Sequence, residues 1–459
     1  MKKNTLYIFV WAIFIVSNGC SKSDFLNEKS RSDIVQPKTV ADFQQLLDYP
    51  TIQQHISALP ALADDDYAVN AADWESSITQ TERNSYVWAR DLYGGDEDMR
   101  DWWLNYQLIF YCNNVLEGLA EIENQDDPGL LYVKGQALFK RAYAFYDLAR
   151  NYCNVYDEAT AGADLGIPLR TNAGISELTP RSTLQETYDR ILGDLQTAYT
   201  MLPADRGNNL FRPTKVAVDA LLARIYLDMR KYDKAESHVT ASLGAYGKLL
   251  DFNDISITDT RPFTRDNVEL IYNSMTVGFY YFTSNATGSP SFVTPELIEL
   301  YNADDLRLQL FYAPHTNGTY KRKNGYFGSG SYPFTGLATD EMYLIKAECL
   351  ARRGETTAAM DTLNNFLRTR FRATVPYVPV TASNAAEALQ YTLQERRKEL
   401  VGRCLRWQDL KRLNKEGANI TLTRSINGVV YTLPPNDPRY IFPIHPKEIA
   451  LSGIVQNPR

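Results

Sequence analysis

The sequence lacks the residue patterns that common enzymes and metal sites require. Its 459 residues include five cysteines and four histidines, with no CxxC pair and no HExxH segment that could hold zinc. The nucleophile elbow GxSxG and the phosphate-binding loop GxxxxGKS/T are also missing. We therefore expect no enzymatic activity, no cofactor and no metal.

An excess of positive charge is lacking too. Lysine and arginine total 48 against 55 aspartates and glutamates, which gives a formal net charge of −7. Proteins that bind nucleic acid through its phosphates generally present a basic surface. The composition thus argues against nucleic acid as a partner.

One long apolar run stands out, at the N-terminus. Two lysines precede the run 6–16, LYIFVWAIFIV, which is too short to span a bilayer and is typical of a secretory signal. The dipeptide Gly19-Cys20 follows, and it resembles a bacterial lipobox, in which the cysteine becomes the lipidated first residue. We expect a signal peptide at 1–19 and lipidation of Cys20. A plain secretory signal with an incidental cysteine is the alternative.

The other cysteines follow no disulfide or metal-binding spacing. They are Cys112, Cys153, Cys349 and Cys404. Most fall in helical patterns far apart in the sequence, so we expect buried free thiols, and a disulfide in an oxidising compartment stays open.

Three short acidic clusters are candidates for catalysis or calcium binding. They are Asp64-Asp65-Asp66, Asp96-Glu97-Asp98 and Asp304-Asp305. Glycoside hydrolysis needs two carboxylates held across a sugar, which spacing along the chain cannot show. We expect all three to be solvated acidic loops, with a calcium site at 64–66 as a minor alternative.

Amphipathic helical patterns dominate the chain, and two of them share an internal repeat. Both repeats, 214–243 and 341–370, place small residues where two helices approach closely and large residues in between, at tetratricopeptide spacing. The repeat residues are Leu222, Ala223, Tyr226, Ala235 and Val239 in the first, and Ala347, Leu350, Ala359 and Leu363 in the second, where Gly354 provides the turn. Further helices are predicted at 102–122, 129–151 and 183–201.

The fold class that follows is mostly α, a tetratricopeptide-like helix-pair scaffold or α-solenoid with loop-rich insertions and a few short strands. We place the scaffold at about 35–250 and 338–413, and the insertions at 251–337 and 414–459. Strands are expected at 270–273 and 277–283, and a hairpin is expected in the segment INGVVYTL. Residues 20–459 are expected to form a single domain.

The stretch 393–413, LQERRKELVGRCLRWQDLKRL, carries seven lysines and arginines. An apolar stripe at helical spacing runs through it, and Arg396 and Arg397 interrupt that stripe. A guanidinium there is costly unless it is paired, so we expect one of the two to reach carboxylates or carbonyls elsewhere in the scaffold. The remaining charge is expected to be offset by local pairs, which are Glu399–Arg403, Glu395–Lys398 and Asp409–Arg412.

Aromatic residues in expected loops are the candidates for binding a ligand. A sugar presents an apolar C–H face and a polar rim, so it binds to flat aromatic rings beside amide or guanidinium groups. The candidates are Trp74, Trp88, Tyr93, Tyr280, Phe282, Asn285, Arg322, Asn324, Tyr326, Phe327 and Tyr332. We expect Tyr326, Phe327 and Tyr332 to be exposed, because glycines surround them. Aromatics at helical spacing, such as Trp102 and Tyr143, are expected in the core.

Several segments together resemble the SusD/RagB family of lipid-anchored nutrient-binding proteins. They are Cys20 with Asp24-Phe25-Leu26, Trp102-x3-Tyr106, Ile109-x3-Asn113, 134–152, 294–307, LIKAECLARRGE, ERRKEL to RWQDLKR, and the tail from Phe442-Pro443-Ile444 to Pro458. The resemblance covers nearly the whole mature chain. The family usually has an acidic residue and a glycine where this chain has Val401-Gly402.

The resemblance implies a cell-surface lipoprotein of the outer membrane that serves polysaccharide utilisation. Such a protein captures an oligomeric nutrient and delivers it to a SusC-like TonB-dependent transporter, with the helices packed on the transporter and the loops holding the ligand. A glycan is the expected cargo, and a peptide is the main alternative. A tetratricopeptide adaptor and a surface hydrolase are the competing functions.

Overall fold

The computed structural model describes residues 37–174, 177–278, 280–284, 288–323, 325–328 and 332–459. The chain divides into two units, Met1–Thr39 and Val40–Arg459. The predicted signal peptide and Cys20 lie outside the described residues. The fold below is that of the second unit.

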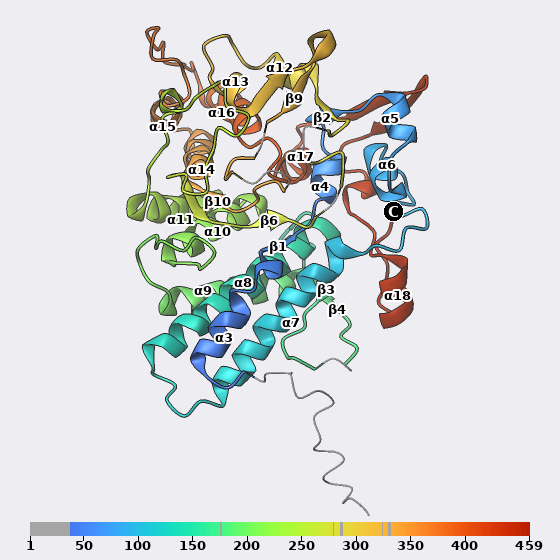
Figure 1. Ribbon diagram of the computed structural model, residues 1–459, viewed down its shortest axis with the longest axis vertical. Helices are drawn as coiled ribbons and strands as arrows, with labels where there is room; N and C mark the ends of the chain where they lie inside the picture. The colour runs from blue at the N-terminus through green and yellow to red at the C-terminus, as the bar shows by residue number, and fades with distance from the viewer. Residues whose placement is uncertain (1–36, 175–176, 279, 285–287, 324, 329–331) are drawn as a thin grey trace, which may run out of the picture. The chain divides into compact units, whose positions relative to one another are not determined.

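Long helices form the first part of the scaffold. They are α3 (Val40–Leu47), α7 (Arg100–Ala120), α8 (Pro128–Tyr152) and α9 (Leu184–Met201). Helix α8 contacts both α7 and α9, and it is buried along most of its length because alanine and large apolar residues occupy all its sides. Figure 1 shows α3, α7 and α8 running side by side. Helix α9 begins with a capping box of Thr183 and Glu186.

The two sequence repeats form two helix pairs. They are α10 (Lys215–Asp228) with α11 (Tyr232–Ala245), and α14 (Thr339–Arg352) with α15 (Thr356–Leu367). The small repeat residues, such as Ala223 and Ala347, are fully buried where the helices meet. Helix α11 packs on α14, so the pairs are neighbours in space although a long insertion separates them in sequence. The predicted helix-pair scaffold is confirmed.

The remaining elements are short. The helices are α4 (Leu59–Ala63), α5 (Ala71–Glu75), α6 (Gln80–Tyr86), α12 (Pro295–Ile298), α13 (Arg307–Phe311), α16 (Ala385–Glu399), α17 (Arg406–Lys415) and α18 (Pro446–Ser452). The strands pair two by two: β1 (Gln54–Ile56) with β6 (Met275–Thr276), β2 (Tyr67–Ala68) with β7 (Phe292–Val293), β3 (Leu165–Pro168) with β4 (Arg181–Thr183), β5 (Leu270–Tyr272) with β10 (Leu337–Ala338), β8 (Tyr312–Pro314) with β9 (Tyr320–Arg322), and β11 (Leu422–Ile426) with β12 (Val429–Leu433). All pairs are antiparallel except β1–β6.

Two of the three strand predictions are confirmed. Strand β5 lies within the predicted 270–273, and β11 and β12 form the hairpin around Asn427-Gly428, both of which adopt positive φ. The predicted strand at 277–283 is wrong, because the described residues 281–283 form a turn. The backbone N–H of Phe282 donates to the Glu82 carboxylate instead of to a neighbouring strand.

The arginine-rich stretch is two helices and not one. Helix α16 ends at Glu399 and α17 begins at Arg406, with Gly402 and Cys404 at positive φ between them. The predicted continuous stripe is therefore wrong, although Leu400, Cys404 and Trp407 are all buried. Glycine accepts the left-handed backbone at little cost, which allows the chain to turn here.

The arginines of this stretch fasten α16 and α17 to distant parts of the scaffold. Arg396 pairs with Asp409, and Arg397 pairs with Asp65 and Asp66, as the prediction of distant carboxylates required. The local pairs Glu395–Lys398 and Asp409–Arg412 are confirmed. The Glu399–Arg403 pair is wrong: Glu399 binds Arg307 and Arg370, and Arg403 binds Asp340.

Most of the acidic clusters are counter-ions of this network. Burial opposes ionisation of Asp65, but Arg406 and Arg397 outweigh it and lower the pKa of its carboxyl group well below the usual value. Asp305 is buried and pairs with Arg307 and Lys398. The expectation of solvated loops is therefore wrong for 64–66 and for Asp305. It holds for Glu97 and Asp98, which are exposed.

The four described cysteines are free and buried, as predicted. Burial raises the pKa of the Cys153 thiol to about 11 and that of Cys112 to about 12. Both thiols are therefore protonated near neutral pH and have little reactivity.

Candidate ligand-binding site

The structure places most of the predicted aromatic platforms inside the protein. Trp88 is 2% exposed, and its indole N–H donates to the carbonyl of Ala63 at 2.8 Å. Tyr93 is buried against His445, and its hydroxyl donates to the carbonyl of Pro443 at 3.0 Å. The polar atom of each ring has a hydrogen-bond partner inside the protein, and the ring itself is buried. Neither ring therefore offers a face to a ligand.

The same correction applies to Tyr280 and Phe282. Tyr280 donates its hydroxyl to Asp101 at 2.7 Å, and Phe282 packs against the rings of Tyr67 and Tyr86. Both side chains are buried. They hold the 277–283 segment onto the first helices of the fold and leave no ring face free.

The expected exposure of Tyr326 and Phe327 is also wrong. Both are buried in an apolar cluster that belongs to the insertion itself. Phe327 packs against Phe334, and the Tyr326 hydroxyl donates to the Glu269 carboxylate. The flanking glycines had suggested an open loop, but the aromatic rings build a core of their own there.

The other candidates have mixed placements. Arg322 and Tyr332 are half-buried, and the Tyr332 ring lies so close to Gly278 that an added Cβ would meet it at 2.9 Å. Trp74 is half-buried in α5, where its indole donates to the carbonyl of Arg83. Asn285 and Asn324 lie outside the described residues.

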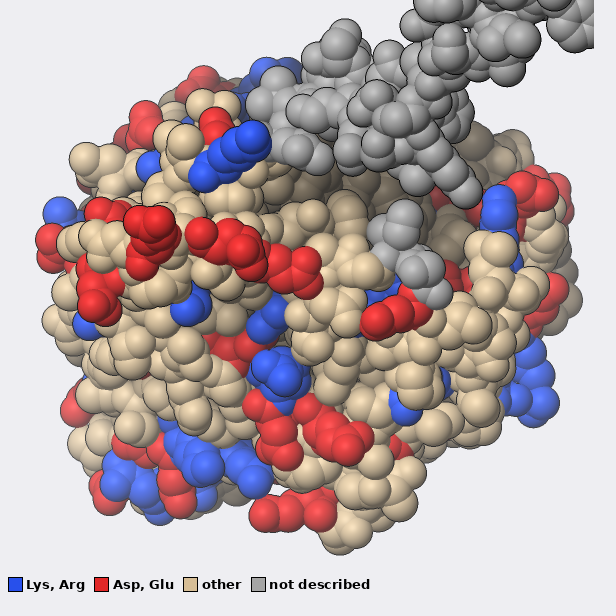
Figure 2. Space-filling view, turned by 90° about the horizontal axis from the view of Figure 1, so that it is seen from below, with Lys and Arg blue, Asp and Glu red and all other residues tan. Residues whose placement is uncertain are grey.

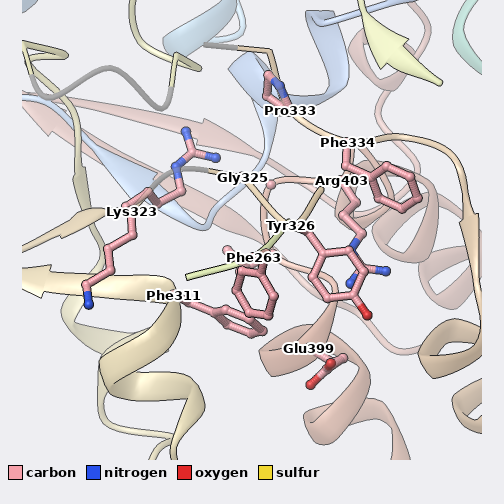
Figure 3. A pocket seen from close by; sticks show the side chains of 12 residues that line it. Phe263, Phe311, Lys323, Gly325, Tyr326, Pro333, Phe334, Glu399 and Arg403 are labelled. Atoms are coloured by element: carbon pink, nitrogen blue, oxygen red, sulfur yellow. The ribbon is translucent and has the colours of Figure 1, made fainter. Parts of the chain in front are cut away.

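A small pocket brings Arg322 and Tyr326 together on the loop-rich insertion. Its volume is about 50 Å³. Further lining residues are Phe263, Phe311, Lys323, Gly325, Pro333, Phe334, Glu399, Val401, Gly402 and Arg403. Figure 3 shows the rings of Phe263, Phe311 and Tyr326 beside one another, with Glu399 below them and the Lys323 amine pointing away. The pocket therefore combines aromatic surface with cationic groups.

The charged groups that line this pocket differ in whether a group of opposite charge already pairs with them. Arg403 pairs with Asp340, and its guanidinium carbon lies 3.8 Å from the centre of the Tyr326 ring. Glu399 accepts hydrogen bonds from Arg307 and Arg370. For Arg322, in contrast, no carboxylate of the described chain lies within 4.0 Å. Its guanidinium remains available for a ligand.

A cluster of three buried carboxylates lies next to the pocket. Oxygens of Glu269, Asp340 and Glu399 lie within 4.8 Å of one another. Arg370 bridges Glu269 and Glu399, and Arg403 neutralises Asp340. Burial raises the pKa of Glu269 to about 7, against the opposing effect of Arg370. Arginines thus already pair with all three carboxylates, which supports a structural role for the cluster.

A larger cavity, of about 660 Å³, lies between the 154–164 segment, α17 and the 436–441 segment. Its charged groups are already engaged. The Lys411 amine donates to the carbonyls of Arg150 and Cys153, Lys415 pairs with Asp157, and Asp437 pairs with Arg439. We therefore regard the smaller pocket as the better candidate for recognition.

The face of the molecule seen from below carries mixed charges. Figure 2 shows basic and acidic side chains interspersed there, with no continuous basic band. Together with the net charge of −7, this distribution gives that face no attraction for a polyanion such as nucleic acid.

Sequence reasoning missed three aromatic walls of the pocket. Phe263, Phe311 and Phe334 come from segments up to 71 positions apart, so only the fold brings them together. Phe334 lies two residues after the candidate Tyr332 in the sequence. Its contact with Tyr326 depends on the tertiary fold, and the local sequence pattern does not predict it.

Two family models match the chain in succession. The model described as "Starch-binding associating with outer membrane" matches residues 24–227, and the model described as "SusD family" matches residues 280–459. The chain belongs to the SusD family. Members of the SusD family are binding proteins and not enzymes, and they associate with the outer membrane.

Similar proteins agree with membership of the SusD family. "SusD-like protein P38" of Formosa agariphila is 25% identical over 397 residues, which cover 71% of this chain and 73% of that protein. Among solved structures, a putative sugar-binding protein of Bacteroides vulgatus has a TM-score of 0.74 at 21% identity and covers 93% of this chain and 99% of its own. A SusD superfamily protein of Bacteroides thetaiotaomicron has a TM-score of 0.71 at 21% identity, covering 92% and 100%. These structures establish the shared fold.

Proposed function

We propose that the protein is a lipid-anchored receptor at the cell surface that binds an oligosaccharide and delivers it to a SusC-like TonB-dependent transporter. Membership of the SusD family supports a role in nutrient binding. The pocket on the insertion supports a sugar-like ligand, because aromatic surface there adjoins a guanidinium with free donors. That pocket is the observation that carries the proposal.

The ligand site that we propose is centred on Arg322, with Tyr332 as a second half-buried candidate nearby on the insertion. The helical scaffold would face the transporter, and the insertion would hold the ligand against its mouth. Cys20 would carry the lipid anchor. A receptor of this kind needs no catalytic group, which agrees with the lack of catalytic motifs in the sequence.

Titration calorimetry of residues 20–459 against a panel of oligosaccharides and a panel of peptides tests the cargo. We expect saturable binding of one oligosaccharide class and unchanged oligosaccharide after long incubation. Binding of peptides alone would change the cargo and keep the receptor role. Cleavage of a bound oligosaccharide would contradict the receptor role.

Purification of the tagged protein from outer membranes tests the partner. We expect a TonB-dependent transporter to co-purify in stoichiometric amount. Co-purification of the transporter without binding of any oligosaccharide or peptide would identify an adaptor and overturn the proposed function.

A further inference from the structure

Three consecutive basic residues, Lys321, Arg322 and Lys323, have no carboxylate partner in the described chain, and the last two line the candidate pocket. Within the described chain, no carboxylate lies within 4.0 Å of any of the three charged groups. The amines of Lys321 and Lys323 donate to the backbone carbonyls of Ser289 and Ile257. The buried arginines close by, such as Arg307 and Arg370, all have carboxylate partners. The fold thus concentrates positive charge here with which no carboxylate of the described chain pairs directly, although Asp259 and Asp64 act on Lys323 and Arg322 from a distance.

The position of Arg322 is fixed although its charge is not paired. It ends strand β9, opposite Tyr312 of β8. Its guanidinium lies against Gly402, where an added Cβ would come within 2.7 Å of Nη1, and the adjacent Val401 offers no carboxylate. Nη2 makes only long contacts, of 3.5 and 3.4 Å, with the carbonyls of Phe282 and Thr283. Most of its donors are free to bind a ligand in a defined place.

One acid responds to the charge of Arg322 without pairing with it. Burial and the neighbouring Asp66 and Asp65 raise the pKa of Asp64 well above the usual value, and Arg322 opposes this shift from a distance. Asp64 is therefore a weaker counter-ion than an exposed aspartate. Arg397 and Arg406 already engage the other two carboxylates of the cluster.

The size of the pocket limits what can occupy it. Its volume of about 50 Å³ is roughly four times the ~10–15 Å³ that one water molecule needs, so it admits a small group and not a whole sugar ring. A carboxylate or a sulfate ester has the required size and charge, and both suit the planar fork of an arginine. Arg322 also lines an adjoining cavity of about 10 Å³ with Ser289 and Ser291, whose hydroxyls bond to each other.

We propose that the ligand is an oligosaccharide with negatively charged substituents, carboxylate or sulfate, and that Arg322 binds one such substituent. This inference rests on the proposed function, since it defines the chemical class of the ligand at the same site. Only the charged substituent would enter the pocket, since a whole sugar ring exceeds its volume. Uncharged oligosaccharides would lack this contact.

Matched pairs of oligosaccharides test the charge requirement. Oligogalacturonates are compared with their methyl esters, and sulfated galactan oligosaccharides are compared with the desulfated chains, by calorimetry of residues 20–459. We expect one charged member to bind roughly tenfold or more tightly than its neutral form, and added salt to weaken its binding. The first pair reports carboxylate recognition, and the second reports sulfate recognition.

Variants then assign the effect to Arg322. Arg322→Gln should remove the preference for the charged form, and Arg322→Lys should retain part of it because charge remains without the bidentate fork. Arg190→Gln changes an exposed arginine on α9 and should behave as the wild type. The melting temperature of each variant verifies that the fold is retained.

The outcomes separate this inference from the proposed function. If the charged and neutral oligosaccharides of a pair bound equally, or if Arg322→Gln kept the preference, the charge requirement would be wrong. The proposed receptor function would not be affected. Binding restricted to neutral oligosaccharides in a broader panel would do the same. If no oligosaccharide of any charge bound, both proposals would fail.

Discussion

Among single residues, several large aromatic side chains are buried with the polar atom at their tip hydrogen-bonded. The indole of Trp88 and the phenols of Tyr93 and Tyr280 are buried with a hydrogen-bond acceptor at the tip. Burial of such a ring contributes strongly to stability once the tip is satisfied. These residues therefore act on folding, and ligand affinity depends on other groups.

Trp88→Ala should destabilise the protein by about 3–5 kcal/mol, because a large buried side chain is replaced by a cavity and the Ala63 carbonyl loses its donor. Urea denaturation at constant pH measures the change. Trp103→Ala, on a side chain that is 40% exposed, is the control and should cost less than about 1 kcal/mol. Similar losses in both variants would contradict the structural role of Trp88.

His55 makes stability depend on pH. Burial lowers the pKa of its imidazole from 6.5 to about 4, against the opposing effect of Asp147. As the pH falls from 6.5 to 4, the unfolded chain takes up a proton that the folded protein refuses, so the free energy of unfolding decreases by about 3 kcal/mol in total.

His55→Gln should lack this contribution. The free energy of unfolding of the wild type minus that of the variant should therefore fall by about 3 kcal/mol between pH 7 and pH 4. Other buried acids titrate in the same range, and the comparison with the variant removes their effect. Denaturant titrations at several pH values provide the measurement. Parallel curves for the two proteins would show that His55 does not titrate as expected.

Among the elements, α16, α17 and the turn between them depend on buried ion pairs. Arg370 is fully buried and joins Glu269 to Glu399 at 2.8 and 2.9 Å. Such a group is costly to bury, and removal of one partner leaves uncompensated charge inside the protein. The arginine-rich stretch 393–413 thus attaches α16 and α17 to the rest of the scaffold through buried ion pairs.

Arg370→Met should cost about 3–5 kcal/mol, because the buried Glu269 loses its arginine partner and Glu399 keeps only Arg307. The control is Arg353→Met, which removes an exposed pair with Glu236 and should cost less than about 1 kcal/mol. Thermal and urea unfolding compare the two variants. A loss below 1 kcal/mol in Arg370→Met would mean that the network contributes little to stability.

The sequence was sufficient to predict the helices and insufficient to predict the pocket, for physical reasons. Alanines such as Ala223 and Ala347 lie where helices touch, so their spacing reports a local geometry. Exposure of Tyr326 and Phe327 depends on distant rings such as Phe263, which no local pattern encodes. The break at Gly402 was hidden because the apolar residues around it keep a helical spacing across the turn.

For the whole molecule, the anchor is the property to test. None of the helices in the described part of the chain is long and apolar enough to cross a membrane. Cys20→Ala should release the protein into the soluble fraction of cells that lack the transporter, since the predicted lipid would be lost. Cys112→Ala, at a buried thiol, should stay with the membrane. Membrane association of Cys20→Ala in those cells would refute lipidation.

The contact between α11 and α14 has a consequence for how such receptors can diversify. Because these helices pack together, the intervening segment leaves the scaffold and returns to it at neighbouring points. The entropy of closing a loop grows only slowly with its length, so the exposed turns of the segment can lengthen or shorten at little cost, whereas Glu269 and Arg307 must stay to pair with Arg370 and Glu399. A segment between Tyr246 and Thr339 taken from a relative should therefore give a folded chimera if it keeps the carboxylate of Glu269 and the guanidinium of Arg307. Exchange of the segment would then transfer the ligand preference and leave the helical scaffold as it is.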